Sequence, residues 1–75
     1  MSYRVVFRAA ARLEFEEAAV WYDARRQGLG EEFLREIDEL VLRAATHPER
    51  YPVVVGDVRK AVARRFPYSV FFRIR

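Results

Sequence analysis

The chain has 75 residues, a net charge of +3 and no cysteine. A chain of this length forms one domain near the lower limit for a self-supporting core, and without cysteine it has neither a disulfide framework nor a cysteine-based zinc site. Because no apolar run reaches the roughly 18 residues of a membrane span, and arginines interrupt the segment where a signal peptide would be apolar, we expect a cytoplasmic protein with no membrane partner.

The chain opens with a short predicted strand, residues 3–7, YRVVF. Tyr3, Val5 and Phe7 alternate with Arg4 and Val6, which is the two-residue period of a strand. The mixed character of the interposed residues favours a partly covered edge of a sheet.

A helix is predicted next, from about Ala9 to Arg25. One apolar stripe recurs at helical spacing and comprises Ala11, Phe15, Ala18 and Tyr22, with Trp21 at its border. A second, smaller apolar patch comprises Leu13, Val20 and Ala24. We interpret both patches as core; the alternative is that one of them touches a neighbouring helix or a partner.

The segment Gly28-Leu29-Gly30 ends this helix, because glycine adopts the left-handed cap conformation without strain. A second helix is predicted from about Glu31 to Thr46, where Pro48 follows and stops it. Its apolar face consists of Phe33, Ile37, Leu40, Val41 and Ala44, with the spacing of an amphipathic helix. Helices joined by so short a turn should pack as an antiparallel hairpin.

The rest of the chain is predicted to be extended. Residues 48–52 form a loop, residues 53–55 a brief strand, and Gly56-Asp57 a turn into a hairpin that spans Val58 to Arg75. Its two strands alternate in β-branched and aromatic residues and meet at Phe66-Pro67, because proline donates no ladder hydrogen bond. The order β-α-α-β-β predicts a two-layer α+β fold in a single domain, residues 1–75, with the helical hairpin on one face of an antiparallel sheet.

Charge is unevenly distributed along the chain. The last eighteen residues contain six basic residues and no acid; since the whole chain carries +3 and this stretch +6, residues 1–57 carry −3. Such a stretch is typical of a surface that binds a polyanion or an acidic protein segment. The candidate binding residues are Arg59, Lys60, Arg64, Arg65, Phe71 and Arg73. The alternative is an ordinary solvated strand face whose cations pair with acids of the helices.

Other residue types offer little for chemistry. Phe72, with Val70 and Ile74, has the parity of a core strand residue, whereas Phe71 has the opposite parity. His47, the only histidine, has no obvious partner for acid–base catalysis. Neither a metal site nor a cofactor is therefore predicted.

The chain resembles the RelE/ParE superfamily of bacterial toxins, also called plasmid stabilization proteins. The likeness is carried by YRVVFRAAAR, WYDARRQGLGEEF, HPERYP and VRKAVARRFPYSVFFRIR, which follow one another along nearly the whole chain. The resemblance implies the toxin component of a type II toxin–antitoxin pair, held inactive by a cognate antitoxin. One branch of the superfamily cleaves mRNA on the ribosome, and the ParE-like branch poisons DNA gyrase by binding.

Departures from the pattern of the cleaving branch favour the ParE-like branch. Lys60 stands at one basic position of the cleaving branch, but Val62 and Ser69 stand where further basic residues are expected. If the chain did cleave mRNA as a ribosome-dependent endonuclease, the resemblance implies that the catalytic residues would be Lys60, Arg64, Tyr68 and Arg73.

The resemblance also implies that the domain is C-terminally truncated. Family members continue beyond the equivalent of Arg75 with another strand, which would lie between the first strand and the strand that contains Phe71, so unpaired edge groups are expected there. Strand addition by another chain, in a homodimer or a strand-swapped assembly, is one way to complete such a sheet. A further alternative is an inactive fragment that only binds an antitoxin or itself.

Overall fold

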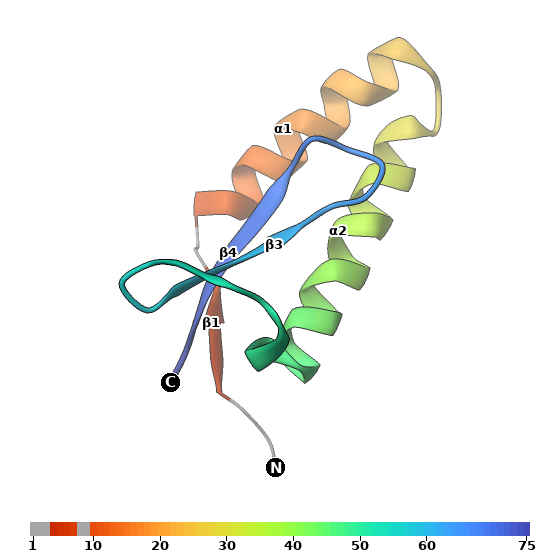
Figure 1. The fold of residues 1–75 in the computed structure, drawn as a ribbon. Coiled ribbons are helices and arrows are strands. Elements are labelled where there is room, and N and C mark those ends of the chain that lie inside the picture. The colour runs from red at the N-terminus through yellow and green to blue at the C-terminus, as the bar shows by residue number, and fades with distance from the viewer. Residues whose placement is uncertain (1–3, 8–9) are drawn as a thin grey trace.

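The computed structural model describes residues 4–7 and 10–75, and within them the strands form one antiparallel sheet (Figure 1). The strands are β1 (Val5–Phe7), β2 (Val53–Val55), β3 (Val58–Val62) and β4 (Ser69–Ile74). Their order in the sheet is β1-β4-β3-β2, so β1 and β2 are the edges. Of the predicted first strand, Tyr3 lies outside the described residues.

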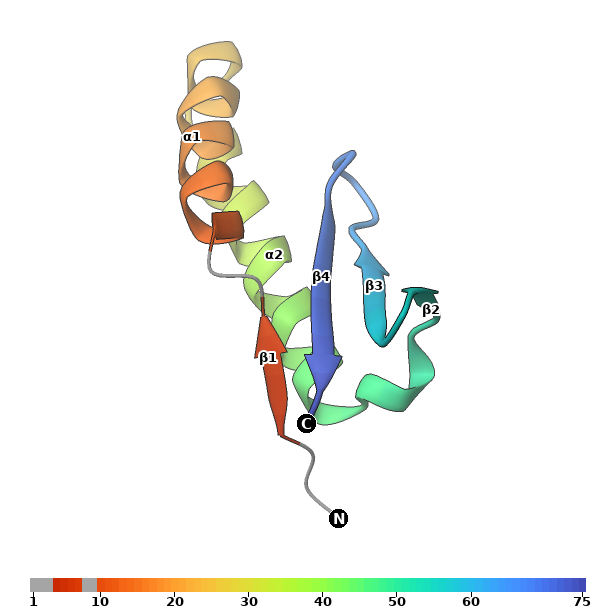
Figure 2. The same cartoon turned by 90° about the vertical axis from the view of Figure 1, so that its left-hand side faces the viewer.

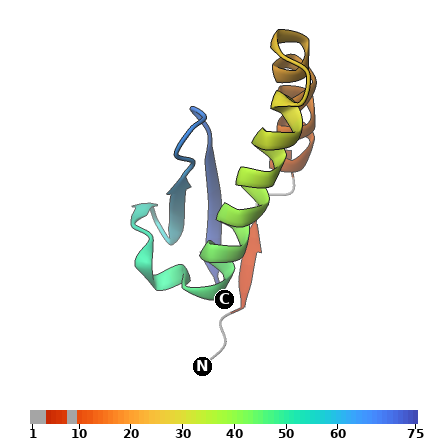
Figure 3. The ribbon, with the colours of Figure 1, turned by 90° about the vertical axis from the view of Figure 1, so that its right-hand side faces the viewer.

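Two helices, α1 (Ala10–Arg25) and α2 (Leu29–Thr46), form the second layer. Figures 2 and 3 show them as an antiparallel hairpin on one side of the sheet, with its far end beyond the strands. The Cα radius of gyration of 13.0 Å exceeds the roughly 11 Å expected for a compact chain of this length, in line with this overhang. The predicted two-layer α+β fold is confirmed, and a short 3-10 helix (Pro48–Arg50) occupies part of the predicted loop.

The turn between the helices is shorter than predicted. Gly28 alone has the left-handed conformation, with φ of 90°, and α2 begins at Leu29, so Gly30 lies inside the helix. A Cβ at Gly30 would overlap the carbonyl oxygen of Ala19 on α1. The backbone N–H of Gly30 donates a 2.7 Å hydrogen bond to Oδ1 of Asp23, which satisfies one of the free amides of the first turn of α2. Glycine is therefore needed at position 30 for close helix packing and not for a turn.

The core lies between α2, the inner face of the sheet and one side of α1. Phe33 is fully buried and stacks edge-on with Phe15, Phe66 and Tyr68. The predicted face of α2 is confirmed, because Phe33, Ile37, Leu40 and Ala44 are all buried. On β4, Val70 and Phe72 are buried as predicted, and Ile74 is partly so.

The second apolar patch of α1 is not core. Val20 is 73% exposed and Ala24 is exposed as well, while the side chain of Leu13 lies outside the described part of the chain. The reason is the direction in which α1 packs on α2. The Phe15 ring lies 6.1 Å from the Phe33 ring and the Ala19 carbonyl approaches Gly30, so the opposite side of α1 faces solvent. For this patch, the interpretation as core is wrong.

The strand β3 ends earlier than its alternating pattern predicted. The backbone amides of Arg64 and Arg65 donate hydrogen bonds of 2.9 and 3.0 Å to Oε2 of Glu36 on α2. These amides are thus used by a helix side chain and not by a neighbouring strand. The chain leaves the sheet after Val62 and re-enters it at Ser69.

No gap separates the first and last strands. β1 pairs directly with β4, with Val5 opposite Ile74, Val6 opposite Arg73 and Phe7 opposite Phe72. The prediction of unpaired edge groups between these strands is therefore wrong.

Within the described residues, no helix has the length and apolar character required to cross a membrane.

Candidate interaction surface

The sheet face turned away from α1 and α2 is covered by no other described element (Figure 2). Alternate strand residues point to this outer face, because their neighbours Phe7, Ala61, Val70 and Phe72 point into the core. The outer-face residues are Val6, Val58, Lys60, Val62, Ser69, Phe71 and Arg73. Arg75 follows β4 with the same parity as Phe71 and Arg73 and lines the same face. The surface combines apolar area with cations.

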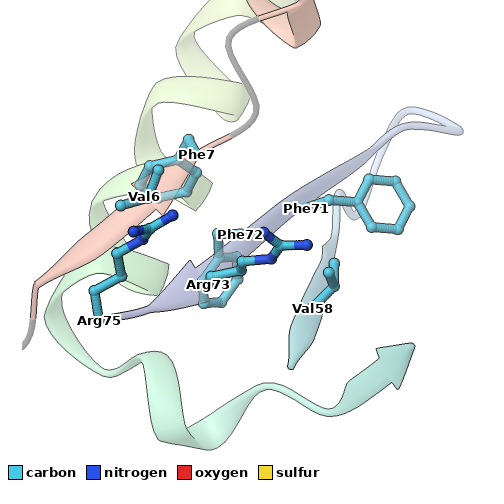
Figure 4. Close-up of a pocket in the computed structure, with 7 residues that line it drawn as sticks. All are labelled: Val6, Phe7, Val58, Phe71, Phe72, Arg73 and Arg75. Carbon is cyan, nitrogen blue, oxygen red and sulfur yellow. The ribbon is translucent and has the colours of Figure 1, made fainter. Parts of the chain in front are cut away.

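A shallow cavity of about 390 Å³ opens on the outer face. Figure 4 shows Arg73 of β4 between Val6 of β1 and Val58 of β3, with Arg75 on the side of Val6 and Phe71 on the side of Val58. Phe7 and Phe72 line it as well. The cavity therefore has apolar walls with two guanidinium groups beside them.

The cations of the outer face differ in how they are neutralised. Arg73 Nε lies 3.1 Å from Oδ1 of Asp57, in an exposed ion pair. Lys60 Nζ lies 6.0 Å from the centroid of the Phe71 ring, near the outer limit of a cation–π contact. Among the described residues, neither Lys60 nor Arg75 has a carboxylate within 4.0 Å. Two positive charges of this face remain available to a partner.

The other predicted cations lie elsewhere. Arg59 points to the helix side, where its Nη1 donates a 2.7 Å hydrogen bond to the carbonyl oxygen of Tyr51. Arg65 pairs with Glu32 of α2 at 3.0 Å, and Arg64 lies beside it, exposed, against the same helix. Of the six candidate binding residues, the structure thus brings together Lys60, Phe71 and Arg73.

The four residues that the RelE resemblance implies as catalytic are also separated. Lys60 and Arg73 lie on the outer face, whereas Arg64 lies beside α2. The ring of Tyr68 packs on the helix side, 4.9 Å from the Phe33 ring. No single side of the sheet presents all four.

Sequence reasoning missed five of the seven residues that line the cavity, namely Val6, Phe7, Val58, Phe72 and Arg75. Strand parity could have found Arg75, which shares the parity of Phe71 and Arg73. Val6 and Val58 come from neighbouring strands, and their inclusion depends on the register of β1 and β3 against β4. That register was not predicted.

Neither the titratable groups nor the candidate metal ligands of the described residues indicate a second site. A hydrogen bond from Arg65 above all, and then one from Arg26, holds the pKa of Glu32 below its ordinary value, and burial raises the pKa of the Tyr22 phenol. His47 Nδ1 lies 3.9 Å from Oε1 of Glu49. The described residues contain no cluster of three metal-ligating side chains.

Comparison of the chain with protein-family models, with curated proteins and with solved structures finds no match. The resemblance to the RelE/ParE superfamily therefore stays a prediction from the sequence.

Proposed function

We propose that this chain is the toxin component of a type II toxin–antitoxin pair and acts, like the ParE branch, by binding DNA gyrase. The observation that carries the proposal is the open outer face of the sheet, where Arg75 lines an apolar cavity and Lys60 lies near the Phe71 ring of the same cavity. Neither cation has a carboxylate of the described residues within 4.0 Å. The sequence resemblance supplies the class of target, and the surface supplies a means of contact.

The surface is suited to a protein partner with acidic and apolar side chains. Arg75 can offer a planar fork of donors to a carboxylate, and Lys60 a compact charge. The cavity that Arg75 and Phe71 line is large enough, at about 390 Å³, to receive an apolar side chain from the partner. Such a combination of a desolvated apolar centre and charged surroundings is the usual composition of a protein interface.

Binding is favoured over RNA cleavage by the separation of the candidate catalytic residues. Cleavage of a phosphodiester needs acid–base groups and positive charge directed at one phosphate. Tyr68 is held in the ring cluster on the helix side, and Arg64 lies beside α2. Neither points toward the outer face that holds Lys60 and Arg73.

The test uses growth of a bacterial culture after induction, together with supercoiling by purified gyrase in the presence of the protein. We expect arrested growth and inhibited supercoiling, and we expect both effects to be lost in Lys60→Glu/Arg75→Glu. The matched control, Arg35→Glu/Arg43→Glu, makes the same change of charge on exposed positions of α2 and should remain active.

Three outcomes would contradict the proposal. Codon-phased mRNA cuts without any effect on gyrase would assign the chain to the ribosome-dependent endonucleases. Equal activity of the outer-face variant and the wild type would show that this face makes no contact with the target. Normal growth with undisturbed supercoiling would leave only a fragment that binds an antitoxin or itself.

A further inference from the structure

A second surface lies on the helix side of the molecule, in a groove between α1 and the segment that joins β3 to β4. The groove encloses about 620 Å³. Its walls are formed by Glu14, Glu17, Trp21 and Tyr22 from α1 and by Pro67 and Tyr68 from the connecting segment. It shares no residue with the cavity on the outer face.

Aromatic rings form much of the groove: Trp21 is exposed, and Tyr22 and Tyr68 are partly buried. Trp21 is 54% exposed, and its ring centroid lies 5.1 Å from that of Tyr22, which in turn lies 6.3 Å from that of Tyr68. The Trp21 ring already accepts a cation, because the Arg25 guanidinium carbon lies 4.1 Å from its centroid. Electron-rich ring faces attract lysine and arginine side chains.

Two carboxylates border these rings. Glu14 and Glu17 lie one turn apart on α1, and both are exposed. Among the described residues, neither has a basic side chain within 4.0 Å. Their charge therefore repels an anion and is available to a cation that enters the groove.

We propose that this groove binds a lysine or arginine side chain of a basic peptide segment in a partner protein. The apolar stem of such a side chain would lie against Tyr22, Pro67 and Tyr68, and its charged end would reach the carboxylates. The charge complementarity selects a basic partner, the opposite of the acidic one proposed for the outer face. The inference does not depend on the proposed toxin function.

The test titrates the purified protein with tetra-arginine and tetra-lysine and follows the fluorescence of Trp21, the only tryptophan in the chain. We expect a saturable change of emission that tetraglutamate does not cause and that weakens with added salt. In Glu14→Gln/Glu17→Gln the affinity should fall about two- to five-fold for each carboxylate removed, the range of single exposed charge contacts. The control Glu31→Gln/Asp38→Asn removes the same charge from α2, outside the groove, and should bind as the wild type does.

The proposal is overturned by an emission that does not change with the cationic peptides, or by equal weakening in the groove variant and the control. Concentration-dependent self-association that the groove variant abolishes would also overturn it, because a second copy of the chain would then be the occupant. Thermal unfolding of both variants checks that the exposed substitutions leave the fold intact. Growth arrest and gyrase inhibition are measured separately, so failure of one proposal does not affect the other.

Discussion

Replacement of Gly30 by alanine tests the close packing of the helical hairpin. The added Cβ would overlap the carbonyl oxygen of Ala19 and lie 2.8 Å from Oδ1 of Asp23. To admit it, α1 and α2 must move apart at the point where the Gly30 amide donates its 2.7 Å hydrogen bond to Asp23. The substitution thus introduces overpacking and weakens the bond that holds the start of α2.

The sign of the change in unfolding free energy distinguishes overpacking at Gly30 from the effect of helix propensity. Alanine inside a helix is favoured over glycine by about 1 kcal/mol, so propensity alone predicts that Gly30→Ala stabilises the protein. Overpacking costs about 1–3 kcal/mol, and the weakened hydrogen bond about 1 kcal/mol more. We expect a net destabilisation of about 2 kcal/mol, a large part of the roughly 4–11 kcal/mol that a chain of this length has.

Circular dichroism during heating and during urea titration measures the change. A loss of about 2 kcal/mol lowers the Tm of a domain of this size by about 8–16 °C. Gly28→Ala is the matched control: a Cβ there has no atom within 4 Å, but φ is +90°, so it should lose only about 1 kcal/mol through backbone strain. A Gly30→Ala protein that is as stable as the wild type, or more so, would contradict the close contact between α1 and α2 at Gly30.

Three further changes test other contacts. Phe33→Ala removes a fully buried ring and should lower the free energy of unfolding by about 3–5 kcal/mol, measured in urea; a loss under about 1 kcal/mol would contradict its central place in the core. Glu36→Ala frees the amides of Arg64 and Arg65 and should cost about 1 kcal/mol, with faster hydrogen exchange at these two amides; unchanged exchange would count against the contact. A hydrogen bond from Arg65 above all lowers the pKa of Glu32. The stability that the ionised Glu32 carboxylate contributes is therefore present above the ordinary glutamate pKa of 4.5 and is lost as the pH falls through the lowered pKa of the folded state. Unfolding of Glu32→Gln should therefore depend less on pH below 4.5, and an identical pH dependence in the two proteins would exclude this contribution.

The layers of the fold could be predicted because they depend on local periodicity. The spacing of Phe33, Ile37 and Leu40 indicates the buried face of α2, and the alternation of Val70 and Phe72 indicates the buried face of β4. Features set by contacts between distant residues could not be predicted. The early end of β3 depends on Glu36, 28 positions away from Arg64, and nothing in the local pattern indicates it.

The exposure of Val20 shows a related limit of sequence reasoning. An apolar residue at helical spacing indicates a possible core position only if another element covers that side of the helix. Here α1 is covered by α2 on the side of Phe15 and Ala19, and Val20, 73% exposed, has no described element over it. The hydrophobic pattern identifies which faces of a helix can be buried. Which of these faces is buried depends on where neighbouring elements pack.

The candidate site could be predicted as a charged segment but not as a surface. Arg59 and Lys60 are adjacent in sequence, and because neighbouring strand residues point to opposite faces, Arg59 binds the Tyr51 carbonyl on the helix side while Lys60 reaches the outer face. Composition cannot distinguish the two positions. Only the register of β3 against β4, with Lys60 opposite Phe71, places Lys60 beside the aromatic ring.

The two proposed surfaces have opposite charge because the helices and the sheet divide the ionisable residues between them. Glu32 pairs with Arg26 and Arg65, so carboxylates of α2 neutralise cations on their own side and cannot reach through the sheet to Lys60 or Arg75. On the outer face Arg73 pairs with Asp57, and no carboxylate of the described residues lies within 4.0 Å of Lys60 or Arg75. A partner that covers the outer face must therefore be acidic there, and a segment that continues into the groove beside Glu14 must change sign, which a uniformly charged polymer such as nucleic acid cannot do.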